Sequence, residues 1–370
     1  GYTSFILTIV GKDDPTTSGN ITVDTTWKKS QSPILIQSDV CVQNGATLTI
    51  EPGVEVRFLG AYALKIHGTL IAKGTDTEKI TFTSDKKEPG SWQCIYFAPG
   101  SNGTNYMMTP AVSVYPPLDP VYESGSIISN CVIEYAGAGG NDGNLQDGTY
   151  VGYTAAITCY YSAPYIYKNE IKNNAKDGID IICSSYCIFR NTIVNNEWNG
   201  MDIKRSSGTI CRNSIENNTM NGISINTFNQ NSTIIYNDIL GNKWSGIDDT
   251  SSNDEYTKVT ISNNNIKNNS KYGIYRFQGR AYVTYNNILG NGKSQYCKFT
   301  NEEHYYSPGV ISHRDTNADL VSSNYWGTSN SDNIESFIYN PSNINGYAIP
   351  VSTINYLPIE TSEITNAGPQ

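Results

Sequence analysis

The sequence predicts an all-β protein built as a parallel β-helix, a solenoid whose coils consist of short strands. Six consecutive copies of one repeat carry an Asn with Ile or Val three residues before it, Ile two residues after it and a second Asn five residues after it. The first Asn of each copy is Asn169, Asn191, Asn213, Asn237, Asn264 and Asn286. Their spacings of 22, 22, 24, 27 and 22 residues match the length of one solenoid coil.

Apolar residues in each copy lie two or three apart between Asn and Gly, which favours short strands over helices. In five of the six copies a Gly follows the first Asn by nine residues: Gly178, Gly200, Gly222, Gly246 and Gly273. We expect the repeated Ile side chains to form inward ladders. Asn tolerates left-handed backbone and is expected to stack on the Asn of the next coil. Each coil adds about 4.8 Å, so roughly ten coils form a rod about 50 Å long.

The repeat also predicts where the parts of the chain begin and end. We predict an N-terminal arm and cap at residues 1–30, the β-helix at 31–330, and a C-terminal cap and tail at 331–370. Residues 101–126 and 136–153 interrupt the repeat and are predicted to be loop insertions, which in solenoids usually decorate one face.

Two flanking segments carry a resemblance to known proteins. Residues 21–84 contain GATLTIEPGVEVRF and GTLIAKGTDTEKITFTS, and residues 322–341 read SSNYWGTSNSDNIESFIYNP. With the repeat, they resemble right-handed parallel β-helix proteins of the pectate-lyase-like superfamily, with the carbohydrate-binding and sugar-hydrolase type of coil repeat found in secreted bacterial and archaeal surface proteins. The resemblance implies a right-handed coil. It leaves the function open, because that superfamily contains lyases, hydrolases, epimerases, adhesins and inert scaffolds.

Composition favours a secreted or cell-surface protein. The chain has eight cysteines without zinc-ligand spacing, which predicts disulfides, and Cys187 with Cys211 on the adjacent coil is the first candidate pair. The cysteines are Cys41, Cys94, Cys131, Cys159, Cys183, Cys187, Cys211 and Cys297. Five sequons predict N-glycosylation at Asn20, Asn102, Asn217, Asn231 and Asn268.

Charge and hydropathy exclude several partners. A net charge of −9 without a basic run argues against nucleic acid and anionic membranes. The apolar run from Phe5 to Val10 is too short to span a bilayer. No cofactor is predicted, although Asp142 and Asp147 in a Gly-rich tract can offer oxygen ligands to calcium. That tract lacks EF-hand spacing, and a solvated loop is the alternative.

One outward column carries the candidate catalytic residues. The second residue after each coil Gly points outward, which aligns Asp180, Asp202, Ser224 and Asp248. Asp180 and Asp202, about 5 Å apart, can bind calcium or act as the acid and nucleophile of a retaining glycosidase. Lys204 can neutralise a uronate or act as a base. The alternative is an ordinary solvated Asp column.

The motifs of the superfamily's known enzymes are missing from the sequence. There is no Asp-Pro-His-Glu of the alginate epimerases and no Gly-His-Gly of the polygalacturonases, and Asp248-Asp249 matches only one fragment of the polygalacturonase pattern. This departure argues against catalysis.

A second column indicates glycan binding. Two residues before the coil Gly lie Lys176, Trp198, Met220, Trp244 and Lys271. The two indoles stand two coils apart, about 10 Å, which suits stacking on alternate sugars of an extended glycan. Asp248 and its neighbours can bind the sugar hydroxyls. The alternative is that bulky residues only shield the end of the core.

The ends of the rod give a third hypothesis. A β-helix exposes unpaired strand edges that must be capped. The arm has β-forming residues, with Phe5, Leu7 and Ile9 alternating, and can either cap its own rod or add a strand to a neighbouring copy. We therefore predict a secreted, non-catalytic structural protein that assembles with copies of itself. The alternative is a β-helix that binds or cleaves an extracellular polysaccharide.

Overall fold

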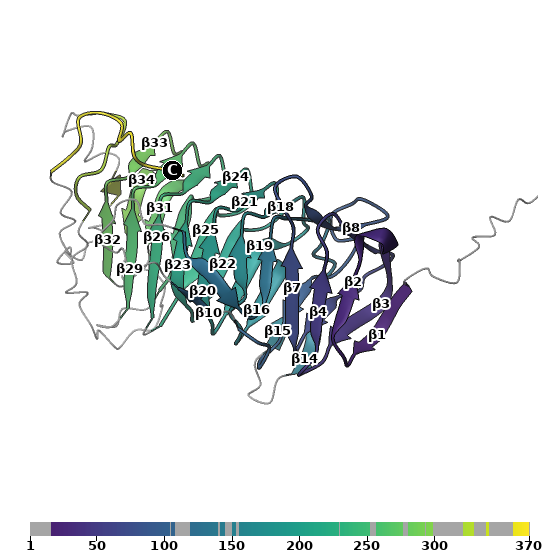
Figure 1. The fold of residues 1–370 in the computed structure, drawn as a ribbon. Helices are drawn as coiled ribbons and strands as arrows, with labels where there is room; N and C mark the ends of the chain where they lie inside the picture. Colours follow the sequence, from purple (N-terminus) through teal and green to yellow (C-terminus); the bar gives the residue numbers. More distant parts are fainter. Residues whose placement is uncertain are drawn as a thin grey trace, which may run out of the picture.

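The protein is a parallel β-helix, as predicted, and each coil passes through three faces (Figure 1). The structure, a computed structural model, describes residues 16–103, 105–107, 119–139, 141–144, 150–152, 155–228, 230–251, 257–276, 280–292, 294–298, 321–328, 338–339 and 358–369. Parallel pairing of each strand with the strand one coil later gives about ten turns. Because strands pair between coils, the register of one coil fixes that of the next.

The first face is a ten-stranded parallel sheet. Its strands are β2 (Thr25–Trp27), β4 (Thr47–Ile50), β7 (Thr69–Lys73), β12 (Ile127–Ser129), β17 (Tyr165–Tyr167), β20 (Ser185–Phe189), β23 (Ser207–Cys211), β26 (Asn231–Ile235), β29 (Lys258–Ser262) and β32 (Arg280–Thr284). The inward ladder of this face contains Ile166, Ile188, Ile210, Ile234, Ile261 and Val283, which are buried. These are the Ile and Val positions that precede the repeat Asn, so the predicted core ladder is confirmed.

The second face consists of shorter strands that follow the first repeat Asn. They are β5 (Glu55–Phe58), β8 (Ile80–Ser84), β13 (Cys131–Glu134), β18 (Glu170–Lys172), β21 (Thr192–Val194), β24 (Ser214–Glu216), β27 (Asp238–Leu240), β30 (Asn265–Lys267) and β33 (Asn287–Leu289). In each second-face strand from β18 onward, the central residue is an Ile that is buried in the core. The second face therefore packs as a single aliphatic ladder.

The third face follows the coil Gly. Its strands are β6 (Leu64–Ile66), β9 (Ile95–Phe97), β16 (Ala155–Tyr160), β19 (Asp177–Ile182), β22 (Met201–Lys204), β25 (Ile223–Asn226), β28 (Ile247–Asp249), β31 (Tyr272–Arg276), β34 (Ser294–Lys298) and β35 (Ile338–Tyr339). A Cβ on Gly200 would lie 2.5 Å from Ile215 Cγ2 and 2.6 Å from the Gly222 carbonyl oxygen. The close approach of backbone and core at this corner explains the repeated glycine.

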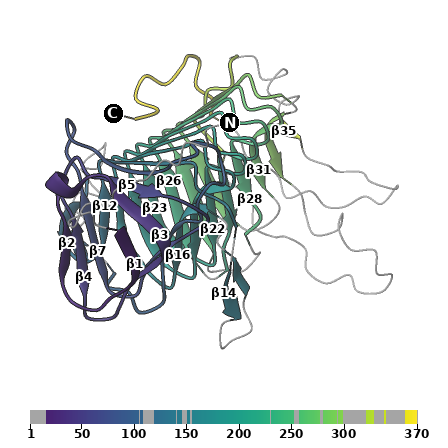
Figure 2. The ribbon, with the colours of Figure 1, turned by 90° about the vertical axis from the view of Figure 1, so that its right-hand side faces the viewer.

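At the start of the rod, one long strand belongs to two faces. The long β3 (Ile34–Val42) pairs with β5 on the second face and β6 on the third, and β1 (Thr16–Ile21) pairs with β3. A single helical turn, η1 (Lys29–Gln31), precedes β3. Figure 2 looks at this end of the rod and shows β1, β2 and β3 in front.

Two Asn ladders run along the corners of the coil. In the first, Asn191 Nδ2 donates to Asn213 Oδ1 at 3.0 Å, and Asn213 Nδ2 donates to Asn237 Oδ1 at the same distance. This ladder runs from Asn169 to Asn324, and the second runs from Asn174 to Asn291. All of these side chains are buried. The predicted stacking of Asn on Asn is confirmed.

The left-handed backbone lies one residue earlier than the predicted Asn positions. The residue before each Asn of the first ladder has a φ between 54° and 58°, as Arg190, Arg212 and Tyr236 illustrate. In the second ladder this place is taken by Asn173, Asn195, Asn217, Gly241, Asn268 and Gly290. The left-handed residue turns the corner, which lets the following Asn point inward and bond along the axis.

The two predicted loop insertions each contain a hairpin. β10 (Asn105–Met107) pairs antiparallel with β11 (Val121–Ser124), and β14 (Asn141–Asn144) with β15 (Tyr150–Gly152). Residues 358–369 fold back onto the second face, where the Asn287 amide donates to and accepts from the backbone of Ile364. Figure 1 shows this segment, in yellow, at the C-terminal end of the rod near β33. This segment therefore packs against the side of the rod at β30 and β33, and the predicted C-terminal cap stays a prediction.

The described cysteines form no disulfides, so the predicted disulfides are wrong for Cys41, Cys94, Cys131, Cys159, Cys183, Cys187 and Cys211. Cys187 is in register with Thr209, whereas Cys211 is in register with Phe189. The preferred pair is therefore two residues out of register, which separates its Cα atoms by about 8 Å, beyond the usual reach of a disulfide. Cys131 and Cys159 are buried among the apolar side chains of the core. The side chain of Cys297 lies outside the described residues.

Candidate functional site

The predicted outward column exists and lies on the third face. Strand register places Asp180 beside Asp202, Asp202 beside Ser224, and Ser224 beside Asp248. We call these four residues the acidic column. The register rule from the coil Gly therefore located the column correctly.

The members of the acidic column differ in their exposure. Asp180 is 0% exposed, whereas the Asp202 side chain is 15% exposed. Lys204 Nζ lies 3.3 Å from Asp180 Oδ2 and 2.7 Å from Asp202 Oδ2. Burial lowers the pKa of Lys204, but the carboxylates of Asp180 and Asp202 outweigh it and raise that pKa overall. Lys204 is thus held as an ammonium ion, which argues against its predicted role as a base. Two carboxylates already contact its ammonium group, which also argues against its predicted role of neutralising a uronate.

A further carboxyl group, which the sequence reasoning did not single out, lies beside the column. Asp177 is 1% exposed and accepts a 2.7 Å hydrogen bond from the Asn199 backbone N–H. Burial, followed by the charges of Asp202 and Asp180, raises its pKa well above the usual range. Asp177 begins a third ladder, which continues through Asn199 and Asn221 to Ser245. The signal in the sequence was its position directly before the coil Gly.

Asp248 is the most unusual carboxyl group of the column. Asn221 Nδ2 donates to its Oδ2 at 3.2 Å, while its buried Oδ1 has no hydrogen-bond partner. Burial, followed by the charge of Asp249, raises its pKa to about 6. Asp248 therefore keeps its proton to a higher pH than an ordinary exposed carboxyl group does.

This raised pKa predicts a pH-dependent stability. The folded state holds the Asp248 proton more tightly than the unfolded state, so ionisation destabilises the fold as pH rises from about 4 to 6. We expect Asp248→Asn to stabilise the protein by about 1–3 kcal/mol at pH 8 and to leave it unchanged near pH 3. Urea unfolding at both pH values checks this, and an equal gain at both would contradict it.

The predicted indole column also exists, and lysines complete it. We call Lys176, Trp198, Met220, Trp244 and Lys271 the indole stripe. Trp198 and Trp244 are 39% and 41% exposed. Lys176 Nζ lies 3.9 Å from the Trp198 ring centroid, and Lys271 Nζ lies 3.3 Å from that of Trp244. Each indole is thus partly exposed, and the ammonium group of a lysine from an adjacent coil lies over its ring.

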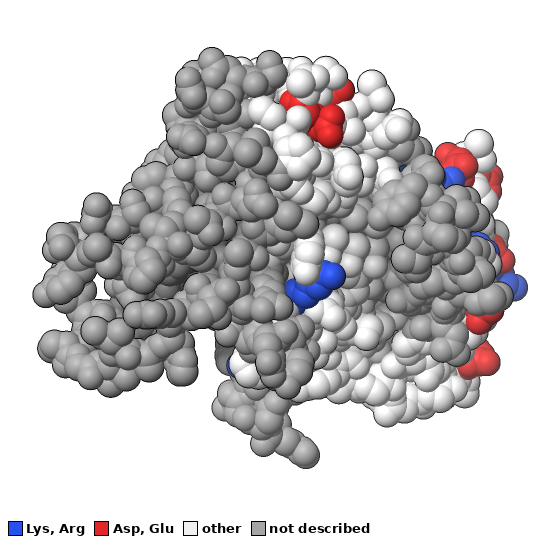
Figure 3. All heavy atoms as spheres, turned by 90° about the vertical axis from the view of Figure 1, so that its left-hand side faces the viewer, with Lys and Arg blue, Asp and Glu red and all other residues white. Residues whose placement is uncertain are grey.

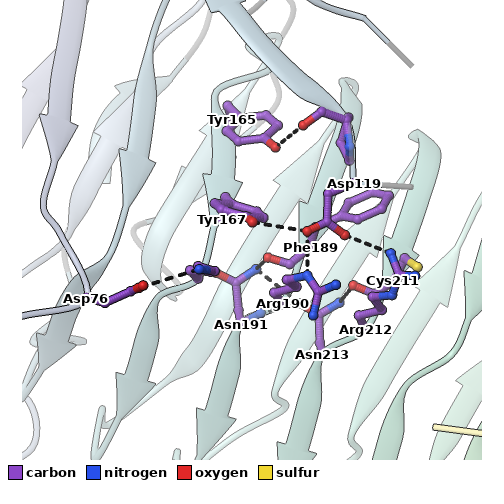
Figure 4. A network of polar contacts seen from close by, with 12 residues as sticks. Asp76, Asp119, Tyr165, Tyr167, Phe189, Arg190, Asn191, Cys211, Arg212 and Asn213 are labelled. Carbon is purple, nitrogen blue, oxygen red and sulfur yellow. Dashed lines mark hydrogen bonds and ion pairs between the residues drawn. The ribbon is translucent and has the colours of Figure 1, made fainter. Parts of the chain in front are cut away.

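The first face carries a different polar cluster, shown in Figure 4. Asp119 Oδ1 pairs with Arg212 Nη1 at 2.7 Å, and Asp119 Oδ2 contacts Arg190 and accepts a bond from Tyr167 Oη. Tyr165 Oη donates to the carbonyl oxygen of Pro120 at 2.6 Å. These contacts fasten the segment leading into β11 over the apolar outer surface of β17, β20 and β23. We interpret this cluster as a structural clasp.

Other sequence candidates stay apart from these sites. All five predicted glycosylation sites are exposed, and their use stays a prediction. Phe5, Leu7, Ile9 and Asp147 lie outside the described residues, as does the side chain of Asp142. Among described residues, no group of three or more His, Cys, Asp and Glu can hold a metal ion. Calcium binding therefore has no support from the acidic column.

Figure 3 looks at the C-terminal end of the rod, where acidic and basic side chains lie in small separate groups. No helix in the described ranges is long and apolar enough to cross a membrane.

Comparison with known proteins identifies the family. Residues 155–324 match the family described as "Right handed beta helix region", and residues 19–149 match "Pectate-lyase like beta helix domain". The chain belongs to the right-handed parallel β-helix proteins of the pectate-lyase-like superfamily.

Individual relatives match less of the chain or at lower identity. Protein bark beetle of Drosophila melanogaster is 46% identical over 66 residues, which are 18% of this chain and 2% of that protein. A mutant of the periplasmic alginate epimerase AlgG is 15% identical, with a TM-score of 0.50 over 79% of this chain and 74% of that chain. The Dettilon tailspike protein is 14% identical, with a TM-score of 0.45 over 79% and 54% of the two chains. Likeness at these identities concerns the fold.

Proposed function

We propose that the third face binds an extended polysaccharide that lies along the axis of the rod. The observation that carries this proposal is the pairing of the indole stripe with the acidic column across the same coils. Strand spacing places Trp198 and Trp244 about 10 Å apart, so two sugar rings of one chain can stack on them. The carboxylates of Asp202 and Asp248 then accept hydrogen bonds from sugar hydroxyls.

The distribution of covering segments supports the choice of face. Within the described part of the chain, the β10–β11 hairpin packs on the first face and residues 358–369 pack on the second. The third face instead carries Asp248, whose Oδ1 has no hydrogen-bond partner, and the corner before this face carries two partly exposed indoles. Exposed aromatic rings beside a few polar groups are typical of ligand sites.

The shared fold guides the first choice of ligand. The name of AlgG states that it acts on alginate, and we take polysaccharides as the ligand class to test first. A ligand of this kind is extracellular or periplasmic, which agrees with the predicted secreted location. The predicted filament role depends on the arm with Phe5, Leu7 and Ile9 and stays a prediction, with no described contact to favour it.

Removing both indoles tests this function. We expect Trp198→Ala with Trp244→Ala to weaken polysaccharide binding by about 10–100-fold, a loss of about 1.4–2.7 kcal/mol, because both stacking surfaces disappear. The melting temperature should stay the same, since both rings are partly exposed. Calorimetry against soluble neutral, uronic-acid and pectic polysaccharides measures the binding.

Phe228→Ala is the matched control, because Phe228 is an aromatic residue 58% exposed outside the indole stripe. It should bind like the wild type. A wild-type protein that binds none of these polysaccharides, or a control that loses as much affinity as the double variant, would refute the proposed function.

A further inference from the structure

We propose that the polysaccharide held by the third face is cationic, a chain of amino sugars whose ammonium groups lie against Asp202 and Asp248. This inference rests on the proposed polysaccharide binding and names the chemical class of the ligand. Two observations carry it: the partly exposed carboxyl groups of the acidic column, and the ammonium groups that already lie on both indoles of the indole stripe.

Burial decides which carboxyl groups of this region can touch a ligand. Asp180 is 0% exposed and contacts Lys204, and Asp177 is 1% exposed. Neither can reach a sugar that lies on the face, which removes Asp180 from the pair that the sequence suggested. Asp202 and Asp248 are both partly exposed, so the ligand meets these two carboxyl groups.

The spacing of Asp202 and Asp248 matches that of the two indoles. Both carboxyl groups are in register with Ser224, one coil on either side of it, so their backbones lie about 9.6 Å apart. Trp198 and Trp244 are likewise two coils apart. A chain that stacks alternate sugars on the indoles therefore brings the same substituent of those sugars to both carboxyl groups.

Each indole already binds an ammonium group. Lys176 Nζ lies 3.9 Å from the Trp198 ring centroid, and Lys271 Nζ lies 3.3 Å from that of Trp244. The face of an indole attracts cations, and proteins use this attraction to bind cationic ligands. Burial raises the pKa of Asp248 and the charge of Lys271 opposes that rise, so one ammonium group acts on both Trp244 and Asp248. The ammonium groups of a ligand would find the same surroundings.

A chain of uronic acids finds no free cation on these strands. Lys204 is the only basic side chain on β22, β25 and β28, all of whose residues are described. Its Nζ already lies 3.3 Å from Asp180 Oδ2 and 2.7 Å from Asp202 Oδ2. Ionised Asp202 and Asp248 repel the carboxylate of a uronate and attract an ammonium group. Charge therefore favours the cationic chain.

Unsatisfied polar atoms also indicate a ligand that donates hydrogen bonds. Asp248 Oδ1 is buried without a partner, while Asn221 Nδ2 donates to Oδ2 at 3.2 Å. Thr158, which is in register with Asp180, is 0% exposed and its hydroxyl also has no partner. Such atoms are costly and are common where a ligand or water completes the bonding. An ammonium group offers three donors and no acceptor, which suits an unpaired carboxylate oxygen.

Matched oligosaccharides test the class of ligand. The full chain is titrated by calorimetry, at about pH 6 and low salt, with hexasaccharides of glucosamine, N-acetylglucosamine and galacturonic acid. The first two share their rings and linkage and differ in whether the amino group is charged or acetylated. We expect the glucosamine chain to bind at least about 10-fold more tightly than the N-acetylglucosamine chain, and the galacturonic acid chain to bind least. Added salt should weaken glucosamine binding, because it screens the ion pairs.

Variants of the full chain locate this preference. Asp202→Asn with Asp248→Asn should abolish the preference for the glucosamine chain and leave binding of the N-acetylglucosamine chain nearly unchanged. Glu216→Gln, which removes a carboxylate from the second face, should keep the preference. Lys271→Met frees the Trp244 ring and removes a positive charge beside Asp248, so it should strengthen glucosamine binding by about 3-fold.

Equal affinities for the glucosamine and N-acetylglucosamine chains, or tighter binding of the galacturonic acid chain, would overturn the cationic ligand class. Weaker glucosamine binding by Lys271→Met would also overturn it. So would a preference that survives in the double Asp variant, because it would then come from the net charge of −9 on the whole chain. In each case the proposed polysaccharide binding would stand. A wild-type protein that binds none of these chains, and none of the polysaccharides named above, would refute the proposed function and this inference with it.

Discussion

Replacing Ile215 by Asp is expected to abolish folding. Ile215 is 0% exposed and forms the centre of the second-face ladder, in register with Ile193 and Ile239. Removing its side chain alone costs about 2–5 kcal/mol, and an unpaired buried carboxylate adds several more. The sum approaches the whole stability of a typical domain, about 5–15 kcal/mol. Circular dichroism and soluble yield of the purified variant measure the loss.

Two matched variants separate burial from charge. Ile215→Val should cost only about 0.5–1.5 kcal/mol, because the side chain stays apolar. Asn226→Asp adds the same charge at an exposed position of the same coil, beside Lys204, and should change stability by less than about 0.5 kcal/mol. If Ile215→Asp unfolds at the same urea concentration as Asn226→Asp, the inward register of the second face is wrong.

Much of the fold could be predicted because every coil must satisfy the same structural constraints. Each coil must point an Ile inward, turn a corner and contribute an Asn to each ladder. The spacing of these residues therefore predicts the register. The predicted column of Asp180, Asp202 and Asp248 follows from that register. The exact turn residue did not follow, because Asn is common both at left-handed corners and in the ladders themselves.

The properties of the site were harder to predict, because they depend on contacts between coils. The sequence predicts that Asp180 points outward, and an outward position favours an exposed side chain. In the structure Asp180 is fully buried and Lys204 from the next coil contacts it. Similarly, the sequence gives the positions of Lys176 and Lys271 but does not predict that they stack on Trp198 and Trp244. Side-chain length and direction, which a register does not give, decide these contacts.

Other features arise where the repeat is broken. The third-face ladder of Ile places Asp249 and Arg276 inside the core, where Arg276 Nη2 pairs with Asp249 Oδ2 at 3.0 Å. Opposite charges at the same inward position of adjacent coils are the sequence signal of this pair. The Asp119 clasp offered no such signal, because its partners Arg190 and Arg212 lie far along the chain and one insertion brings them together.

The last expected result concerns the first Asn ladder, which the repeat predicted and the structure details. Asn213 Oδ1 accepts from the backbone N–H and the Nδ2 of Asn191, at 2.8 and 3.0 Å. Its own Nδ2 donates to the carbonyl oxygens of Ile188 and Cys211 and to Asn237 Oδ1. Asn213→Ala removes all these bonds and leaves buried donors and acceptors without partners. At about 1–3 kcal/mol for each such group, we expect a loss of about 3–5 kcal/mol in urea unfolding.

Asn226→Ala is the control, because Asn226 is exposed on the outer side of β25 and belongs to neither ladder. It should change the free energy of unfolding by less than about 0.5 kcal/mol. The contrast isolates burial, since both variants remove the same amide from the same coil. A loss below about 1 kcal/mol for Asn213→Ala would mean that water replaces the ladder bonds, and the aliphatic ladders alone would then hold successive coils in register.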